Sequence, residues 1–375
     1  MIKFIKERIV FLFILFTFFG TTCAFADQSS DSSSFWNNKI VSLRFHYGFI
    51  VAQHYEIQNV VTGHTRGFEI DFMNQTDGSK LWHDLYHYPQ AGFEFIYLDL
   101  ANPSVLGDAA GLLYIINFPL SYRSDNFRIS FRLGTGLGWV TNKFDRIENH
   151  QNLLISSHIN AAIQLDFESR IKIAKSLYTN FDIGITHFSN GSFKTPNLGI
   201  NNASASIGLN YYLPENKIST HTINIPTSYK KYHFEILLAA GSDQRDPPGG
   251  NSFFASTLSF TALKQTSPKA LNGISLDVFY DLSVKSRILT DSIPFHSNFD
   301  AIRSGIYFDH EQLLGRTSIV VGLGTYIIDH YKKDGNIYDR FGFKFRLSEN
   351  IFANVTLKAH YAKADFVEWG IGVKI

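Results

Sequence analysis

The alternation of apolar and polar residues with a period of two constrains the fold of this 375-residue chain most strongly. In residues 341–347 every second residue is Phe or Leu, and the residues between them are Gly, Lys and Arg. Residues 127–133, 353–361 and 367–375 repeat the pattern, whereas no stretch of the chain beyond its first 38 residues sustains helical periodicity. Successive side chains of a strand point to opposite faces, so these runs predict strands with one wholly apolar face.

The N-terminal region has the three parts of an export signal. Basic residues precede position 9, residues 9–19 form an apolar run, and Ala24-Phe25-Ala26 provides a small-x-small cleavage site. This pattern predicts a signal peptide over residues 1–26. The alternative is a membrane anchor, for which the apolar run is short. Cys23, the single cysteine, would leave with the peptide, so no disulfide or thiol chemistry is expected in the mature chain.

Alternation also occurs in soluble β-sandwiches, but the composition favours a membrane barrel. Aromatic residues make up 15% of the chain, with 35 Phe and 18 Tyr, as expected for girdles at membrane interfaces. The net charge of +1 gives no indication of nucleic-acid binding. We therefore predict an all-β, antiparallel transmembrane barrel in the outer membrane of a Gram-negative bacterium. Charges on the polar faces are expected to line the lumen and to pair there: Arg128, Arg132, Lys344, Arg346, Lys358 and Glu368.

The number of runs indicates roughly sixteen strands, half of them on each side of a break. After a flexible, Ser-rich lead-in over residues 27–38, the barrel is expected to occupy residues 39–375. The break, residues 214–231, contains two prolines and many polar residues, and separates residues 39–213 from residues 232–375. It can be a surface loop of one large barrel or a linker between two eight-stranded barrels, because eight strands suffice to close a barrel. The single barrel is the preferred prediction.

His187 and Ser189 carry the strongest functional indication. Continuing the alternation of Phe181, Ile183 and Ile185 places both residues on the apolar face of their strand. Residues i and i+2 of a strand share a face, so an imidazole there can serve as base for the hydroxyl. A nucleophile on the lipid-facing side suits a lipid substrate. The structural alternative for the pair is a polar patch at the membrane interface.

The longer run from His187 to Asn201 resembles the lipid A 3-O-deacylase (PagL-type) family of outer-membrane barrels. It contains His-x-Ser-Asn at 187–190, followed by Pro-Asn-x-Gly-Ile at 196–200. Upstream, Tyr88-Pro89-Gln90-Ala91-Gly92 and Asn102-Pro103 are similar to relatives described as acyloxyacyl hydrolases. The resemblance covers about the first half of the mature chain, and nothing specific to the family follows Leu213.

This resemblance implies an eight-stranded barrel whose outward-facing site hydrolyses the ester at position 3 of lipid A with a Ser-His-acid triad and no cofactor. It implies Ser189 as nucleophile, His187 as general base and Asn190 as oxyanion donor. By strict alternation Asn190 points inward, so its role would need its backbone N–H or a local bulge. Asn197 and Gly199 are expected to support the turn.

Position 201 departs from the family, because Asn201 stands where the family has its acid. Asn201 shares the parity of the apolar face of the following strand and can therefore meet His187. A carboxamide oxygen can orient a histidine, but it does not stabilise the imidazolium as a carboxylate does. The sequence thus predicts either a slower enzyme with Ser189, His187 and Asn201 as its triad, or a different third member, a carboxylate supplied by another strand.

Three hypotheses follow. The first, which we prefer, is an outer-membrane serine esterase acting on lipid A or lipopolysaccharide. The second is a non-enzymatic barrel, a scaffold or pore, with a decayed triad; a wide lumen would favour a pore. The third is an exported soluble esterase on a β-sandwich. No metal site is expected, because His46, His158, His233 and His360 do not have metal-ligand spacing.

Overall fold

The computed structural model describes residues 37–375 except 122–123, 125, 214–231, 246–247 and 362. The predicted signal peptide, most of the lead-in and the 214–231 break lie outside the described residues. The described residues form sixteen antiparallel strands, which confirms the all-β prediction. None of the helices among them has the length and apolar character needed to cross a membrane.

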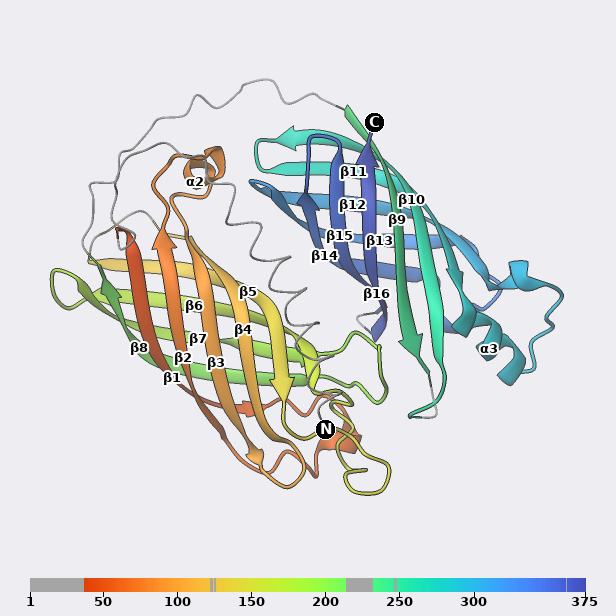
Figure 1. The fold of residues 1–375 in the computed structure, drawn as a ribbon, viewed down its shortest axis with the longest axis horizontal. Coiled ribbons are helices and arrows are strands. Elements are labelled where there is room, and N and C mark those ends of the chain that lie inside the picture. The colour runs from red at the N-terminus through yellow and green to blue at the C-terminus, as the bar shows by residue number, and fades with distance from the viewer. Residues whose placement is uncertain (1–36, 122–123, 125, 214–231, 246–247, 362) are drawn as a thin grey trace, which may run out of the picture. The chain divides into compact units, whose positions relative to one another are not determined.

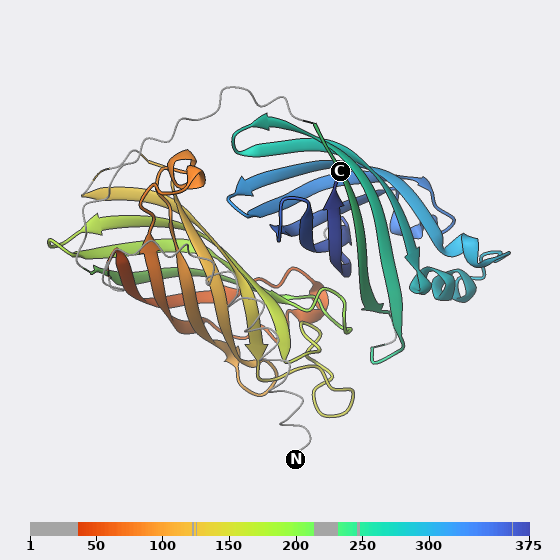
Figure 2. The ribbon, with the colours of Figure 1, turned by 45° about the horizontal axis from the view of Figure 1, so that its top comes forward.

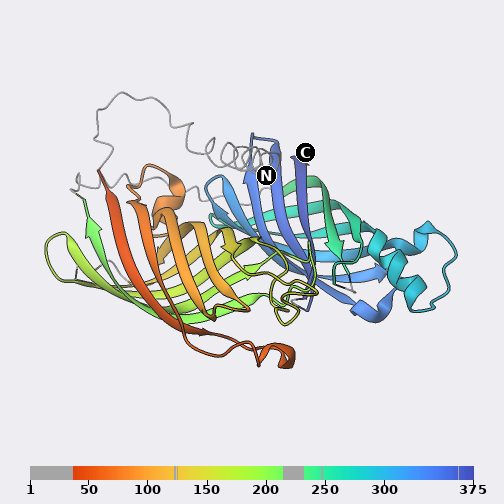
Figure 3. The same cartoon turned by 60° about the horizontal axis from the view of Figure 1, so that its bottom comes forward.

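Strands β1–β8 close into one barrel (Figure 1). Each strand pairs with its neighbour in the chain, and β8 returns to pair with β1 through Tyr211 opposite Val41 and Ala205 opposite Tyr47. The strands are β1 (Lys39–Ile50), β2 (Thr65–Gln75), β3 (Gln90–Asn102), β4 (Gly107–Pro119), β5 (Phe127–Val140), β6 (Ile159–Lys172), β7 (Leu177–Ser189) and β8 (Ile200–Tyr212). The 3-10 helix η1 (Tyr55–Ile57) and the helix α2 (Leu81–Leu85) lie at opposite ends of this barrel (Figure 3).

A second closed barrel follows (Figure 2). Its strands are β9 (Tyr232–Gln244), β10 (Ser252–Ser267), β11 (Ala270–Asp281), β12 (Ile302–Leu314), β13 (Thr317–Ile328), β14 (Ile337–Arg346), β15 (Ile351–His360) and β16 (Lys363–Lys374). β16 closes the barrel by pairing with β9. The helix α3 (Leu282–Thr290) and the 3-10 helices η2 (Asn298–Ala301) and η3 (Lys332–Asp334) belong to the connections at one end.

The tandem arrangement corrects the preferred prediction of a single sixteen-stranded barrel. The physical reason is hydrogen bonding at the sheet edges. The β1 edge is satisfied by β8 and the β9 edge by β16, so β8 and β9 do not pair. Each barrel closes on itself, so its first and last strands pair with each other and leave no sheet edge with unpaired backbone N–H and C=O groups.

Buried ion pairs fill the interior of the first barrel. Arg44 lies 2.8 Å from Glu69 and 2.7 Å from Glu168, and it also pairs with Asp71. Arg132 lies 2.7 Å from Glu69. All of these side chains are buried, so they occupy the lumen that a channel would require.

The second barrel is filled in the same way. Arg340 pairs with Glu368 at 2.9 Å, and Lys344 pairs with Glu235 at 2.9 Å. The cavity beside Arg340 and Lys344 measures about 20 Å³, room for about one water molecule. Of the charges expected in the lumen, Arg346 is an exception: it is exposed at the end of β14 and donates to the Gly315 carbonyl.

Candidate active site

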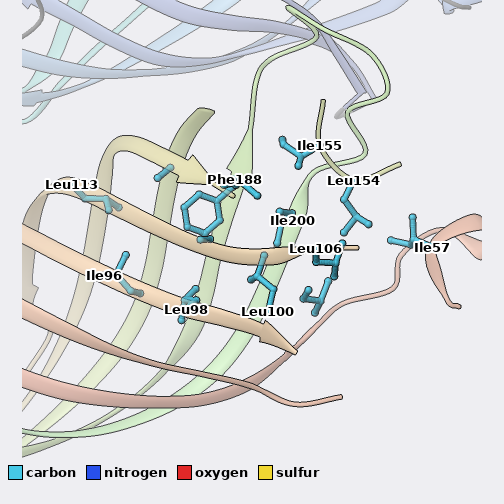
Figure 4. Packing of buried hydrophobic residues seen from close by; sticks show 14 of the residues in the cluster. Ile57, Ile96, Leu98, Leu100, Leu106, Leu113, Leu154, Ile155, Phe188 and Ile200 are labelled. Carbon is cyan, nitrogen blue, oxygen red and sulfur yellow. The ribbon is translucent and has the colours of Figure 1, made fainter. Parts of the chain in front are cut away.

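β7 presents His187 and Ser189 on its outward face. Phe181 and Ile183, which have the same parity, are 47% and 65% exposed. Phe188, between the two candidate residues, points inward and is fully buried in the apolar cluster shown in Figure 4. Both His187 and Ser189 are half-buried at the end of the strand, beside long connections.

Asn201 faces His187 across the β7–β8 pair. The two residues are in register, and His187 Nδ1 lies 2.6 Å from Asn201 Oδ1. A carboxamide oxygen only accepts hydrogen bonds, so this contact requires the proton on Nδ1. Nε2 then carries the lone pair that a general base needs.

Gly199 makes this pairing sterically feasible. Its φ of +80° lies in the left-handed region, and a Cβ there would approach His187 Cε1 to 2.7 Å. The Gly199 N–H donates to the Leu154 carbonyl at 2.9 Å, which fixes the backbone in this position. Gly199 therefore does more than turn the chain, because its missing side chain leaves room for the imidazole.

Two N–H donors converge on the Ser189 hydroxyl oxygen. Asn197 Nδ2 lies 2.9 Å from Ser189 Oγ, and the Gly191 backbone N–H donates to the same atom at 3.2 Å. The Asn190 backbone N–H donates to Asn197 Oδ1 at 3.1 Å. That third bond fixes the orientation of the Asn197 carboxamide, because its oxygen accepts from Asn190 and its nitrogen is then the atom that donates to Ser189 Oγ.

The Asn190 side chain points elsewhere. Its Nδ2 donates to Ser157 Oγ at 2.9 Å and to Ser156 Oγ at 3.2 Å. Asn190 thus braces the β7–β8 turn against the β5–β6 connection, while Asn197 and Gly191 supply the donors next to Ser189. The two asparagines therefore have different roles, since Asn190 holds the turn and Asn197 contacts the hydroxyl.

Within the described chain no hydrogen bond joins Ser189 Oγ to His187. The Nε2 atom of His187 likewise has no hydrogen-bond partner there. Contacts of this kind are commonly long in unliganded sites and tighten when substrate binds. The arrangement therefore contains an imidazole in the tautomer that a general base needs and a hydroxyl held by donors, both on one face.

The β5–β6 connection contributes residues that the sequence analysis did not identify. Leu153 and Leu154 accept backbone hydrogen bonds from Leu198 and Gly199, and Ser156 and Ser157 bind Asn190. The one signal for them is the apolar triplet Leu153-Leu154-Ile155 within an otherwise polar segment. Leu154 and Ile155 are fully buried in the apolar cluster (Figure 4).

Among the described residues, two groups of buried carboxylates have oxygens close enough to hold a metal ion. They are Glu69, Asp71 and Glu94 in the first barrel, and Asp243, Asp281 and Asp365 in the second. Both groups already meet cations of the protein: Arg132 contacts all three members of the first, and Arg245 contacts two of the second. Neither group includes a residue of the candidate site.

Comparison with known proteins identifies two families along the chain. Residues 66–210 match the family described as lipid A 3-O-deacylase (PagL), and residues 232–375 match the one described as acyloxyacyl hydrolase, C-terminal domain. No curated protein matches the chain.

Solved outer-membrane proteins align over most of the chain but with little similarity. A mutant porin of Rhodopseudomonas blastica aligns over 90% of this chain and 99% of its own, at 10% identity and a TM-score of 0.18. An outer membrane channel from Pseudomonas putida F1 aligns over 93% and 98%, at 8% identity and a TM-score of 0.19.

Proposed function

Because the chain belongs to the PagL-type family of lipid A 3-O-deacylases and acyloxyacyl hydrolases, we propose that it is an outer-membrane serine esterase that removes the 3-O-linked hydroxyacyl chain of lipid A. One observation carries the assignment of residues. His187, in the tautomer of a base, and Ser189, held by two N–H donors, share the outward face of β7. The family match alone assigns no residue.

In the proposed reaction Ser189 Oγ attacks the ester carbonyl while His187 Nε2 accepts the hydroxyl proton. The carbonyl oxygen becomes an oxyanion next to Oγ, where Asn197 Nδ2 and the Gly191 N–H can donate to it. The bond between the acyl carbon and the sugar oxygen then breaks, and His187 returns the proton to that departing oxygen. Water hydrolyses the acyl-serine by the same steps, releases a 3-hydroxy fatty acid and regenerates Ser189.

The surface next to Asn201 supports an acyl chain as the substrate. On the outward face of β8, Asn201 is followed by Ala203 and Ala205, both small. The register places Ala203 between Phe49 of β1 and Ile185 of β7. Larger apolar side chains therefore flank a strip of small ones that leads away from the site, and an extended acyl chain can lie along it.

Asn201 makes the proposed enzyme slow. During attack His187 becomes an imidazolium, and a neutral carboxamide stabilises this cation less than a carboxylate would. The hydrogen bond to Nδ1 still selects the productive tautomer. We therefore propose Asn201 as a third triad member that orients His187 without supplying charge.

Release of 3-hydroxy fatty acid by the purified protein from lipid A in detergent micelles tests the proposal. We expect slow release by the unmodified protein, and a loss of at least about 10³-fold in Ser189→Ala. If the protein is folded but releases no fatty acid, the proposed esterase activity is wrong.

A non-enzymatic scaffold is the second candidate. Two observations favour it: Asn201 replaces the acid, and no hydrogen bond joins Ser189 to His187 in the described chain. The packed interiors argue against a pore, because buried ion pairs occupy the lumen of each barrel.

A further inference from the structure

A row of polar side chains interrupts the apolar outer face of the second barrel. Lys264 of β10 is in register with Asn272 of β11, and Asn272 is in register with His310 of β12. Tyr232 of β9 pairs with Lys264, whose Nζ lies 5.6 Å from the centre of the Tyr232 ring. The row therefore crosses four neighbouring strands at one register level.

Asn272 organises the row. His310 Nδ1 lies 2.8 Å from Asn272 Oδ1, and Asn272 Nδ2 donates to Thr266 Oγ1 at 2.6 Å. The carboxamide oxygen accepts only, so the proton of a neutral His310 is on Nδ1 and its Nε2 is directed away from Asn272. Thr266 lies at the irregularity where the β10–β11 register shifts between Gln265 and Ser267, which brings its hydroxyl beside Asn272.

Nitrogen groups dominate this row and carboxylates do not contribute to it. Among the described residues neither Lys264 nor His310 forms a salt bridge; Lys264 lies over the Tyr232 ring and His310 contacts Asn272. Neighbouring strands are about 4.8 Å apart, so the backbones at Lys264 and His310, two strands apart, are separated by about 10 Å. The two side chains can reach one phosphate from either side of Asn272. A phosphodiester is a suitable ligand, because it accepts several hydrogen bonds and carries one negative charge.

Apolar side chains begin next to the row. Two residues further along each strand, the outward positions are Ala262, Ile274 and Phe308, and the latter two are strongly exposed. The row therefore marks a level at which hydrocarbon would give way to headgroups. It lies at the end of the barrel with short turns, residues 268–269 and 315–316, whereas α3 belongs to the opposite end (Figure 1). Short turns are typical of the periplasmic side of such barrels.

We propose that Tyr232, Lys264, Asn272 and His310 form a binding site for the phosphodiester of a glycerophospholipid in the periplasmic leaflet. This inference rests on the proposed membrane placement but not on the esterase chemistry. Lys264 neutralises the phosphate, and His310 contacts it through Nε2 when protonated. Asn272 keeps His310 oriented and adds no charge that would repel the ligand.

Native mass spectrometry of the full-length mature protein in detergent tests this site. The protein is titrated with phosphatidylglycerol and with a diacylglycerol of the same chains, which lacks the phosphate. We expect the unmodified protein to retain phosphatidylglycerol about tenfold more tightly, and Lys264→Ala/His310→Ala to bind both lipids equally. Lys363→Ala, which removes an exposed lysine at the other end of the barrel, serves as the matched control and should behave like the unmodified protein.

Asn272→Asp provides a second variant of almost unchanged size. It retains an acceptor for His310 but places a negative charge in the row, so phosphatidylglycerol binding should weaken by about tenfold. Equal binding of the two lipids by the unmodified protein, or tight binding that survives both variants, would overturn the site. Tighter binding of lipid A than of phosphatidylglycerol at this row would contradict the proposed glycerophospholipid and, with it, the periplasmic leaflet. Fatty acid release measured on the same samples keeps this result separate from the fate of the esterase proposal.

Discussion

His187 and Asn201 face each other across β7 and β8, with 2.6 Å between His187 Nδ1 and Asn201 Oδ1. The contact joins an outward-facing imidazole to a neutral partner. It selects a tautomer without stabilising the imidazolium. This combination predicts an enzyme whose rate is limited by the charge missing at position 201.

Asn201→Asp should raise kcat by about tenfold or more, because a carboxylate of nearly the same size would stabilise the imidazolium formed during attack. Asn201→Ala should lower kcat by about tenfold, because His187 loses its orienting acceptor. Both rates are measured as fatty acid release from lipid A in micelles. An Asp variant no faster than the unmodified protein would show that position 201 does not act on His187 during turnover.

Asn197 and Asn190 should differ in their effects on the reaction. Asn197→Ala removes the carboxamide next to Ser189 Oγ and should lower kcat by about 10²–10³-fold with little change in KM. Asn190→Ala removes the contacts to Ser156 and Ser157, and its main effect should be lower stability of the turn. Steady-state kinetics and limited proteolysis of both variants measure the difference. A larger loss of kcat in Asn190→Ala than in Asn197→Ala would indicate that Asn190, and not Asn197, stabilises the oxyanion.

Gly199→Ala should abolish most activity in a protein that still folds. Its φ of +80° makes a Cβ costly by about 1–3 kcal/mol, and that Cβ would displace the His187 ring. Displacement of a catalytic group by about 1 Å can lower the rate about 10²-fold. Gly63→Ala is the matched control, because its new Cβ would meet only Ala101, at 3.3 Å. Full activity of a folded Gly199→Ala protein would contradict the proposed position of His187.

Ala203→Phe tests the strip of small side chains on β8. The new ring would fill the strip between Phe49 and Ile185, so activity toward long 3-hydroxyacyl chains should fall more than activity toward short ones. Ala110→Phe places the same ring on the outward face of β4, away from the site, and should have no such effect. The ratio of kcat/KM for long and short chains is the measurement. An unchanged ratio would mean that the acyl chain lies elsewhere.

Arg132→Met should destabilise the first barrel by about 3–5 kcal/mol, because it leaves Glu69, Asp71 and Glu94 buried beside one fewer cation. Urea unfolding of the refolded protein in micelles measures the change. Arg66→Met, at an exposed position, is the control and should change stability by less than about 1 kcal/mol. A stability loss equal in both variants would argue that the interior ion pairs do not hold the barrel.

The all-β class and the outward parity of the site could be predicted, since both follow from a period of two in the residues themselves. The outward face of β7 is an example: Phe181 and Ile183 are exposed, and His187 and Ser189 continue their alternation. The number of barrels could not be predicted. Periodicity records which side chains share a face of the sheet, but it does not record that β8 pairs with β1 rather than with β9.

The donors around Ser189 were also beyond prediction from the sequence. Asn190 follows the serine and Asn197 lies in a turn, so alternation gives no orientation for either side chain. Their roles depend on the positive φ angles of Gly191 and Gly199 and on the approach of Ser156 and Ser157 from another connection. Contacts between separate connections leave little trace in local sequence patterns.

Mass spectrometry of lipid A from cells that produce the protein tests the central claim most directly, with Ser189→Ala and His187→Ala produced to equal levels in the outer membrane. We predict that lipid A loses one 3-hydroxyacyl group in cells with the unmodified protein and remains intact in cells with either variant. Intact lipid A in the cells with the unmodified protein and with both variants, with the protein folded in the outer membrane, would contradict the deacylase activity. The non-enzymatic scaffold would then be the remaining candidate function.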